Sequence, residues 1–427
     1  MPNINPVRRI AFVSTRIAGT DGVSLEIGKW TDVLERLGFE CRFISGGTDR
    51  PADQSVVIDE ANFQHPTIAE INAACFGRQS RSREMSALIR MEAASIKNQL
   101  YDAVEALKPD LIIAENALTL PVNIPLGIAL DEFLVESQIP CIAHHHDFVW
   151  ERERYFVNAV DDYLTGYFPP RRADMEHVVI NSVAGGEFSR RTGLPYHVIP
   201  NVMDFDNPPP ADGDHATRLR SKLGFSADDV VILQPTRVVA RKGIEHTIEL
   251  VRRLDDPRYK LMISHGEDDE GPEYPQRVRE YGRLLGVDIT FAGGCIGYCR
   301  DCLQTSSPCY SIWDAYRAAD LVAYPSTYEG FGNAFLEAVF FRKPVFCNRY
   351  TIFRTDIEPC GFRTIAMDAF LTESVIEETR RVLEDADVRE EMVTHNYEVG
   401  RRLFSYRRVA EPLQAMLRKP RQLPPGA

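Results

Sequence analysis

The chain has 427 residues, of which 44% are hydrophobic and 26% are charged. Its length favours two domains over one hydrophobic core, and its composition excludes disordered, collagen-like and low-complexity architectures. The formal net charge of -13 at pH 7, without a long basic run, argues against a nucleic-acid-binding protein and against a protein held on anionic lipid by charge alone.

The cellular compartment is predicted from three negative signals. The most apolar stretch, residues 110–135, is broken by acidic residues, asparagines and prolines, so we expect no stable membrane insertion. Residues 1–9 are followed by only four apolar residues, which are too few for the core of a signal peptide. Nine cysteines are an odd count that suits reduced thiols. These features predict a cytoplasmic protein.

The first predicted elements form a strand–loop–helix–strand unit. Residues 9–14 are a short apolar run that ends in the glycine-bearing loop 18–22. Apolar side chains then recur at helical spacing up to Gly38, which suits a helix C-terminus, and residues 41–45 form another strand-like run. Further strands of this half are expected at residues 111–114, 141–145 and 178–180.

A second unit with the same pattern begins near residue 230. Residues 230–234 and 260–264 read as strands around the loop 237–243 and an amphipathic helix. More strands are expected at residues 289–292, 321–324 and 344–347. Two strand–loop–helix–strand units far apart in the chain predict an α/β protein with two doubly wound, Rossmann-like domains.

The domain boundaries are placed by composition. The proline-rich segment around Pro208 predicts a linker at 207–216. We expect an N-terminal domain at 1–206 and a C-terminal domain at 217–400. Residues 401–427 are predicted as a C-terminal helix and tail that could return to the N-terminal domain.

The segment 328–338 carries two glutamates in a glycine-rich strand-to-helix turn. Glu329 lies in the loop and Glu337 one turn into the helix. The backbone at Gly332 can approach a ligand closely, and the N–H groups of Gly332 and Asn333 near a helix N-terminus suit anionic oxygens. A carboxylate can accept two hydrogen bonds from a vicinal diol, such as a sugar ring offers. A simple structural turn with Glu337 on the helix surface explains the spacing equally well.

Two further loops carry candidate functional residues. Arg237 and Lys242 precede a predicted helix and could neutralise a diphosphate without a metal, although a solvated pair of loop cations is the alternative. Three adjacent histidines, 144–146, follow a predicted strand. Because neighbouring side chains of a strand point to opposite faces, they make a poor metal site. One of them is therefore expected to face the crevice and its neighbour the core, and His144 and His145 are expected to be structural.

Together these segments resemble the retaining glycosyltransferases of family 4, which have the GT-B fold. Glu329 and Glu337, with Gly-Phe-Gly-Asn after the first, resemble the paired-glutamate motif of that family. Other stretches agree in the right order, at residues 181–182, 199–204, 235–243 and 319–326. The resemblance implies two Rossmann-like domains that face each other across a cleft.

The resemblance also implies roles for individual residues. Arg237 and Lys242 would bind the pyrophosphate of a nucleotide sugar, Glu337 the ribose hydroxyls and Glu329 the transferred sugar. His146 would contact that sugar and the reacting centre, so His146, Arg237, Lys242 and Glu329 are the candidate catalytic residues. Donor-binding contacts are implied at Gly22, Arg237, Lys242, Phe331, Gly332, Asn333 and Glu337.

The implied activity is that of a metal-independent, retaining hexosyltransferase. It would move a hexose from a nucleotide diphosphate sugar, with no further cofactor, to a hydroxyl of a small soluble acceptor. A nucleotide-sugar epimerase, a phosphorylase and a noncatalytic nucleotide-sugar sensor are the alternatives. The sequence does not specify the nucleotide base, the hexose, the acceptor or the oligomeric state.

Four of the cysteines lie close together, with the spacing C-x3-C-x2-C-x6-C. Four thiolates on a loop with intervening glycine and proline could hold a structural zinc ion. The family resemblance does not support such a site, and free thiols are the alternative reading. The candidate ligands are Cys295, Cys299, Cys302 and Cys309.

Overall fold

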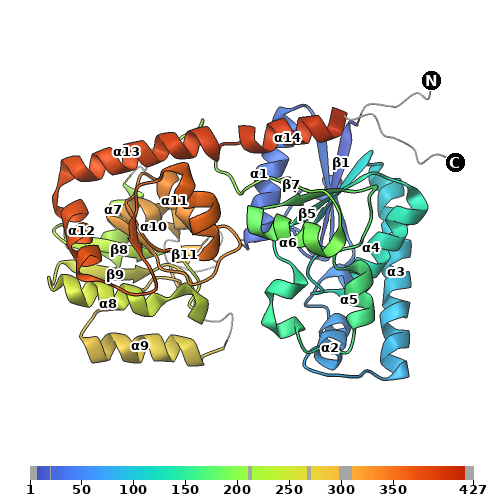
Figure 1. Ribbon diagram of the computed structural model, residues 1–427, viewed down its shortest axis with the longest axis horizontal. Coiled ribbons are helices and arrows are strands. Elements are labelled where there is room, and N and C mark those ends of the chain that lie inside the picture. Colours follow the sequence, from blue (N-terminus) through green and yellow to red (C-terminus); the bar gives the residue numbers. More distant parts are fainter. Residues whose placement is uncertain (1–6, 20, 210–213, 267–270, 298–309, 419–427) are drawn as a thin grey trace. The chain divides into compact units, whose positions relative to one another are not determined.

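A computed structural model describes residues 7–19, 21–209, 214–266, 271–297 and 310–418. The chain divides into two compact units, each of which has a parallel β-sheet between layers of helices (Figure 1). The first unit consists of Met1–Pro200 with Tyr406–Ala427, and the second consists of Asn201–Ser405. Within the described ranges, no helix is both long and apolar enough to cross a membrane.

The first unit has a seven-stranded parallel sheet in the order β3-β2-β1-β4-β5-β6-β7. Helix α1 covers one face, and α3 and α4 pack together on the other (Figure 1). The strands are β1 (Arg9–Ser14), β2 (Glu40–Ser45), β3 (Ser55–Val57), β4 (Leu111–Glu115), β5 (Cys141–His145), β6 (Glu176–Val179) and β7 (His197–Val198). The α-helices are α1 (Gly22–Arg36), α2 (Pro66–Cys75), α3 (Arg83–Leu107), α4 (Ile124–Ser137), α5 (Asp161–Tyr167), α6 (Ser182–Thr192) and α14 (Arg407–Arg418).

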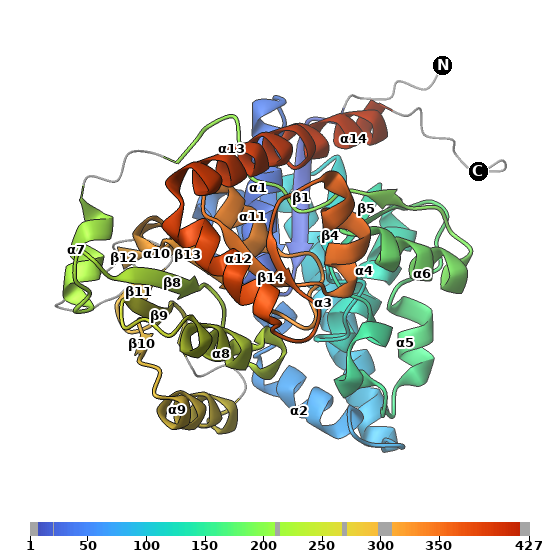
Figure 2. The same ribbon diagram turned by 60° about the vertical axis from the view of Figure 1, so that its left-hand side comes forward.

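The second unit has a six-stranded parallel sheet in the order β10-β9-β8-β13-β14-β15. Helices α8, α9 and α12 cover one face, and α10 and α11 cover the other (Figure 2). The strands are β8 (Val230–Gln234), β9 (Tyr259–Ile263), β10 (Ile289–Phe291), β13 (Leu321–Tyr324), β14 (Val345–Asn348) and β15 (Ile365–Met367), with a separate short pair of β11 (Ile296–Gly297) and β12 (Tyr310–Ser311). The α-helices are α7 (His215–Lys222), α8 (Ile244–Leu254), α9 (Glu273–Leu285), α10 (Ile312–Ala318), α11 (Asn333–Phe340), α12 (Glu373–Glu384) and α13 (Ala386–Leu403).

Each sheet has one point at which the strand order reverses. In the first unit the chain runs outward from β1 through β2 and β3, then continues on the other side from β4. In the second unit it runs from β8 through β9 and β10, then continues from β13. Ligands of such sheets bind at the carboxyl ends of the strands beside this reversal. The topology therefore points to the loops after β1 and β4, and to those after β8 and β13.

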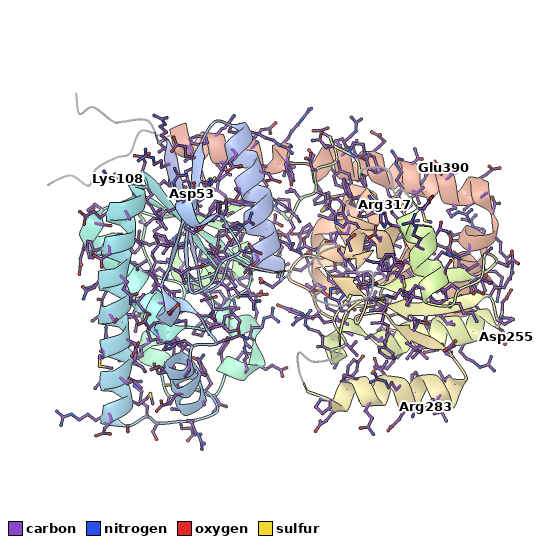
Figure 3. All side chains as sticks on the ribbon, turned by 180° about the vertical axis from the view of Figure 1, so that it is seen from behind. Asp53, Lys108, Asp255, Arg283, Arg317 and Glu390 are labelled. Carbon is purple, nitrogen blue, oxygen red and sulfur yellow. The ribbon has the colours of Figure 1, made fainter. Side chains whose placement is uncertain are left out.

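The prediction of two Rossmann-like doubly wound α/β domains is confirmed. The predicted strands are present with bounds that differ by at most two residues at each end, because buried parallel strands read as continuous apolar runs. The strands that the prediction missed, β3, β7, β11, β12 and β15, have only two or three residues each. Helix ends at Lys108 and Asp255 also lack a sequence signal, since both residues adopt φ of 51° without being glycine (Figure 3).

The chain passes between the units a few residues away from the predicted boundaries. Residues 201–206 belong to the second unit, because Phe205 packs against Phe340 and Tyr397 with ring centroids 5.6 and 5.3 Å away. The Tyr397 hydroxyl also donates to the Phe205 carbonyl at 2.9 Å. At the other end, α14 packs against α1 of the first unit. Residues 210–213 of the predicted linker lie outside the described residues.

Candidate active site

The loops after β8 and β13 are joined at the strand reversal of the second unit. The two strands are neighbours, with Leu321 beside Ile232 in the register. The carbonyl of Arg241 accepts hydrogen bonds from both the backbone N–H and the hydroxyl of Thr327, at 2.9 and 3.2 Å. Gly243 allows this approach, because its φ is +61° and a Cβ atom there would lie 2.5 Å from the Pro325 carbonyl oxygen.

A buried cluster of charges lies where these loops meet. The ammonium group of Lys242 forms an ion pair with Glu329, and Nη1 of Arg241 lies 3.2 Å from the same carboxylate. Lys242 and Glu329 are each only 9% exposed. Burial lowers the pKa of Lys242. Burial opposes ionisation of Glu329, but the charges of Lys242 and Arg241 outweigh it and lower the pKa of this carboxyl.

Arg237 lies close to the same cluster. Its positive charge adds to the effects that lower the pKa of Lys242, after burial and the charge of Arg241. One loop thus places Lys242 and Arg241 against a single buried carboxylate, Glu329, and adds the positive charge of Arg237 near Lys242. The arrangement leaves an excess of positive charge at the carboxyl end of the sheet, and such an excess suits a phosphate-bearing ligand. Arg241 was missed by the sequence analysis, although it is adjacent to Lys242.

The predicted glycine turn forms the start of α11. Gly332 has φ of +136°, and a Cβ atom there would lie 2.5 Å from the Tyr350 hydroxyl. That hydroxyl donates to the carbonyl of the buried Phe331 at 2.7 Å. Gly332 is the N-cap of α11 and has no side chain with which to cap it, so the first N–H groups of this helix suit an anion. The Asn333 side-chain oxygen accepts a hydrogen bond from Asn201 at 2.8 Å.

The two glutamates of the predicted motif have different partners. Glu337 is partly exposed on α11 and accepts a hydrogen bond from the Tyr316 hydroxyl at 2.6 Å. Glu329 is bound to the cations of the loop after β8. The structure therefore gathers Lys242, Glu329 and the turn at Gly332 around the ends of β8 and β13, and it holds Glu337 separately through α10.

In the first unit, the histidines after β5 alternate between two faces as expected. His145 contacts Thr119 through Nδ1 at 2.5 Å and His177 through Nε2 at 3.1 Å. On the opposite face, the His144 ring stacks on Trp30 with centroids 4.1 Å apart, and His146 lies 4.5 Å from His144. His144 and His145 are buried by these contacts, which agrees with the structural role expected for them.

His146 shares a buried carboxylate with His144. Glu115 ends β4 and lies beside His144 in the register. Its oxygens are both 3.0 Å from Nδ1 of His144, and one is 3.1 Å from Nε2 of His146. Burial opposes ionisation of Glu115, but the two imidazoles outweigh it and lower its pKa to about 2. The sequence analysis treated Glu115 only as an interruption of an apolar run. An acid at the carboxyl end of a buried strand was the available signal.

The loop after β1 has a clear structural function. Asp21 is the N-cap of α1, and its carboxylate accepts hydrogen bonds from the N–H groups of Val23 and Ser24, both at 3.1 Å. It also pairs with Arg16 at 3.0 Å. Gly22 is the exposed first residue of the helix. Gly22 follows β1 beside the strand reversal, and its contact with a donor stays a prediction.

The cysteine cluster is described at one of its four positions. Cys295 follows β10, and its thiol donates to the Ala292 carbonyl at 3.4 Å. Cys299, Cys302 and Cys309 lie outside the described residues. A structural zinc therefore stays a prediction. Elemental analysis of protein purified without a metal-affinity step tests it, and less than about a tenth of an equivalent per chain would exclude it.

Comparison with known proteins identifies relatives of this chain. Residues 303–399 match the family model described as glycosyl transferases group 1. Mannosylglucosylglycerate synthase of Thermotoga maritima is 31% identical over 438 residues, which cover 95% of this chain and 98% of the relative. The Petrotoga mobilis protein of the same name is 32% identical over 385 residues, covering 84% of this chain and 86% of the relative.

A solved structure shares the fold. Anabaena HepE, in complex with UDP and glucose, superposes with a TM-score of 0.67 and covers 96% of this chain and 99% of its own length at 15% identity. At this identity the likeness concerns the fold alone. Together with the full-length relatives, it shows that the chain belongs to the glycosyl transferases group 1 family of GT-B glycosyltransferases.

Proposed function

We propose that this glycosyltransferase moves a hexosyl group from a nucleotide diphosphate sugar to a hydroxyl of a small glycoside, with retention of the anomeric configuration. The observation that carries the proposal is the buried cluster of Lys242, Arg241 and Glu329 at the strand reversal of the second unit. Its excess cations suit a diphosphate, and its carboxylate suits a sugar hydroxyl.

The proposed mechanism is electrostatic and needs no metal. Negative charge grows on the diphosphate as its bond to the sugar breaks. Arg237 and Lys242 would stabilise that charge, together with the first N–H groups of α11. Because Lys242 is buried and the first N–H groups of α11 are held by the helix backbone, little reorganisation of these groups is needed during the reaction. The departing phosphate would accept the proton of the acceptor hydroxyl on the same face of the sugar, which gives retention.

The remaining site residues are assigned to the donor. Glu337 would bind the ribose hydroxyls from its position on α11. Glu329 and the backbone of residues 331–333 would bind the transferred hexose. His146 of the first unit would contact that hexose, and Gly22 the donor phosphates. These assignments follow the family resemblance at matching positions of the motif.

The full-length relatives suggest the substrates. We propose that the hexose is mannose and that the acceptor is glucosylglycerate, because mannosylglucosylglycerate synthases match nearly the whole chain. Glucosylglycerate is a glycoside of a hydroxy acid. It fits the small soluble acceptor expected from the sequence.

The test is a panel of GDP-, UDP- and ADP-sugars, each supplied with glucosylglycerate and with its uncharged analogue glucosylglycerol. We expect nucleotide release with one of the mannose donors and glucosylglycerate, an α-linked product by NMR, and unchanged activity in EDTA. Lys242→Met should lose activity, whereas Lys260→Met, a lysine of β9 outside the cluster, should not.

Each alternative gives a different result in the same panel. A product formed from the donor alone would indicate an epimerase, and transfer to or from inorganic phosphate would indicate a phosphorylase. Donor binding without nucleotide release in any mixture would indicate a sensor. Activity that EDTA abolishes and magnesium or manganese restores would contradict the metal-independent mechanism.

A further inference from the structure

His146 is held in place by Glu115 and Asn116, two residues that are not among the proposed donor-site residues. Its Nε2 atom lies 3.1 Å from Glu115, and its backbone N–H donates to the Asn116 side chain at 3.2 Å. His146 keeps 7% of its surface exposed, whereas Glu115 is fully buried. Nδ1 of His146 makes no hydrogen bond within the described part of the chain. One edge of the ring is thus anchored, and the other is left for a ligand.

The anchor itself is well fixed. Glu115 ends a central strand of the sheet, and His144 binds both of its oxygens from the same side as His146. His144 is in turn stacked on Trp30 of α1. A carboxylate held in this way has little freedom to follow the His146 ring. The ring must therefore keep the orientation that Glu115 imposes.

The same donor atoms lie within 4.8 Å of one another, which also fits a metal ion. However, each imidazole nitrogen that points at Glu115 is already within hydrogen-bond distance of it. The carboxylate and the two nitrogens that face it therefore satisfy one another without an ion, whereas Nε2 of His144 points away from Glu115 and has no hydrogen-bond partner among the described residues. We therefore assign Glu115, His144 and His146 to a hydrogen-bond network.

We propose that Glu115 is a positioning residue for the transfer reaction, which acts by fixing the His146 ring with a proton on Nε2 and presenting Nδ1 to the substrate. This inference rests on the proposed function, because it takes from there the contact of His146 with the transferred sugar. It adds a residue that touches no substrate. Its closest parallel in general chemistry is a carboxylate that orients a catalytic imidazole.

The charged groups around His146 come from three elements. Glu115 lies on β4, Glu26 on α1, and Asp147 follows His146 in the chain. His144 on β5 contributes a like charge when protonated. Burial opposes protonation of His146, but these carboxylates, with Glu115 first, outweigh it and raise its pKa. Removal of the Glu115 charge should therefore lower the pKa of His146.

The decisive variant is Glu115→Gln, which keeps the size of the side chain and removes its charge. We expect kcat to fall about a hundredfold with little change in KM for the donor, because a misplaced group near the reacting centre costs about that much. The acid limb of the pH profile, where Nδ1 of His146 takes up a proton, should move to lower pH. Glu115→Asp should restore part of the activity. The matched control is Glu176→Gln, which removes a carboxylate 2.9 Å from His197 on the same sheet.

Two readouts keep the inference separable from the proposed function. NMR of histidine-labelled protein reports the tautomer and titration of His146 without any substrate, so it applies even if no transfer is found. A double variant, Glu115→Gln with His146→Ala, should be no less active than His146→Ala alone. If folded Glu115→Gln keeps the wild-type pH profile and His146 titration, or if the two losses multiply, the inference is wrong. If Glu115→Gln fails to fold, the same measurements on Glu115→Asp decide.

Discussion

Each unit buries one carboxylate near the carboxyl ends of its central strands, but the partners differ. Glu115 in the first unit is bound by two imidazoles, and Glu329 in the second by an ammonium and a guanidinium group. Imidazoles change charge near neutral pH, whereas lysine and arginine ordinarily do not. The comparison predicts that the first cluster changes its charge near neutral pH and that the second keeps its charge.

The largest effect is expected when the fixed-charge cluster loses its carboxylate. Glu329→Leu leaves the buried Lys242 without its ion pair, so unfolding of the second unit should become easier by about 3 to 5 kcal/mol. Hydrogen exchange of β8 and β13 measures this. Glu249→Leu removes the partner of Arg253 in a more exposed pair on α8 and should change stability by less than about 1 kcal/mol. Equal effects of the two variants would contradict the importance assigned to burial.

The second effect is a difference in pH response. Burial lowers the pKa of His144, His145 and His177 below 6.5, so these groups stay neutral in the folded first unit while the unfolded chain takes up protons. Their stabilisation is complete above pH 6.5 and is lost as the pH falls. His146 has a raised pKa and acts in the opposite sense, with its stabilisation complete below pH 6.5. Because the contribution of His146 no longer changes below pH 6.5, the three lowered histidines give a net loss of up to about 4 kcal/mol per pH unit there.

The second unit should not share that loss. Glu329 has a pKa below 4.5, so its stabilisation is complete above pH 4.5 and is lost only at lower pH. Hydrogen exchange between pH 7 and 5.5, corrected for intrinsic rates, should therefore show β4 and β5 losing protection before β8 and β13. Simultaneous loss in both units, or earlier loss in the second, would show that the histidines do not set the acid stability.

A smaller effect is expected at the turn before α11. Gly332→Ala combines a positive φ with a contact of 2.5 Å to the Tyr350 hydroxyl. We expect a stability loss of about 2 kcal/mol and weaker donor binding, because the first N–H groups of the helix must shift. Gly286→Ala is the matched control, since Gly286 also has a positive φ but no atom near a Cβ position. Calorimetry measures the affinity of both variants for the donor nucleotide. Backbone strain alone should lower the stability of both variants, whereas a displaced binding site should weaken binding only in Gly332→Ala.

The smallest effect compares a helix cap in each unit. Asp21 and Asp385 cap α1 and α13 in the same manner, each accepting two backbone N–H groups. Replacement of either by alanine should cost about 1 kcal/mol of stability. Only Asp21→Ala should also lower activity, because the loop after β1 lies at the strand reversal next to Gly22. Thermal unfolding measures the stability of both variants, and a transfer assay measures their activity. Unchanged activity of Asp21→Ala would contradict the assignment of Gly22 to the donor site.

The sequence by itself determined the local structure and the motif loops. Apolar runs and helical spacing located the longer strands and their crossovers, because these patterns depend on neighbours within one element. The glycines before α8 and α11 were recognisable as turns, and their close contacts explain why only glycine fits. The family resemblance then named Lys242, Glu329 and Glu337 before any of their contacts was visible.

Tertiary structure decided which of these residues meet. Lys242 and Glu329 are 87 positions apart, and Glu115 and His146 are 31 apart. Each pair meets because two parallel strands that are adjacent in the sheet end at the same edge, and no local pattern encodes which strands become neighbours. The same holds for α14, which packs on the first unit although it follows the second in the chain. Strand order is a property of the whole sheet. It therefore decided that Glu115 meets His144 and His146, and that Arg241 meets Glu329.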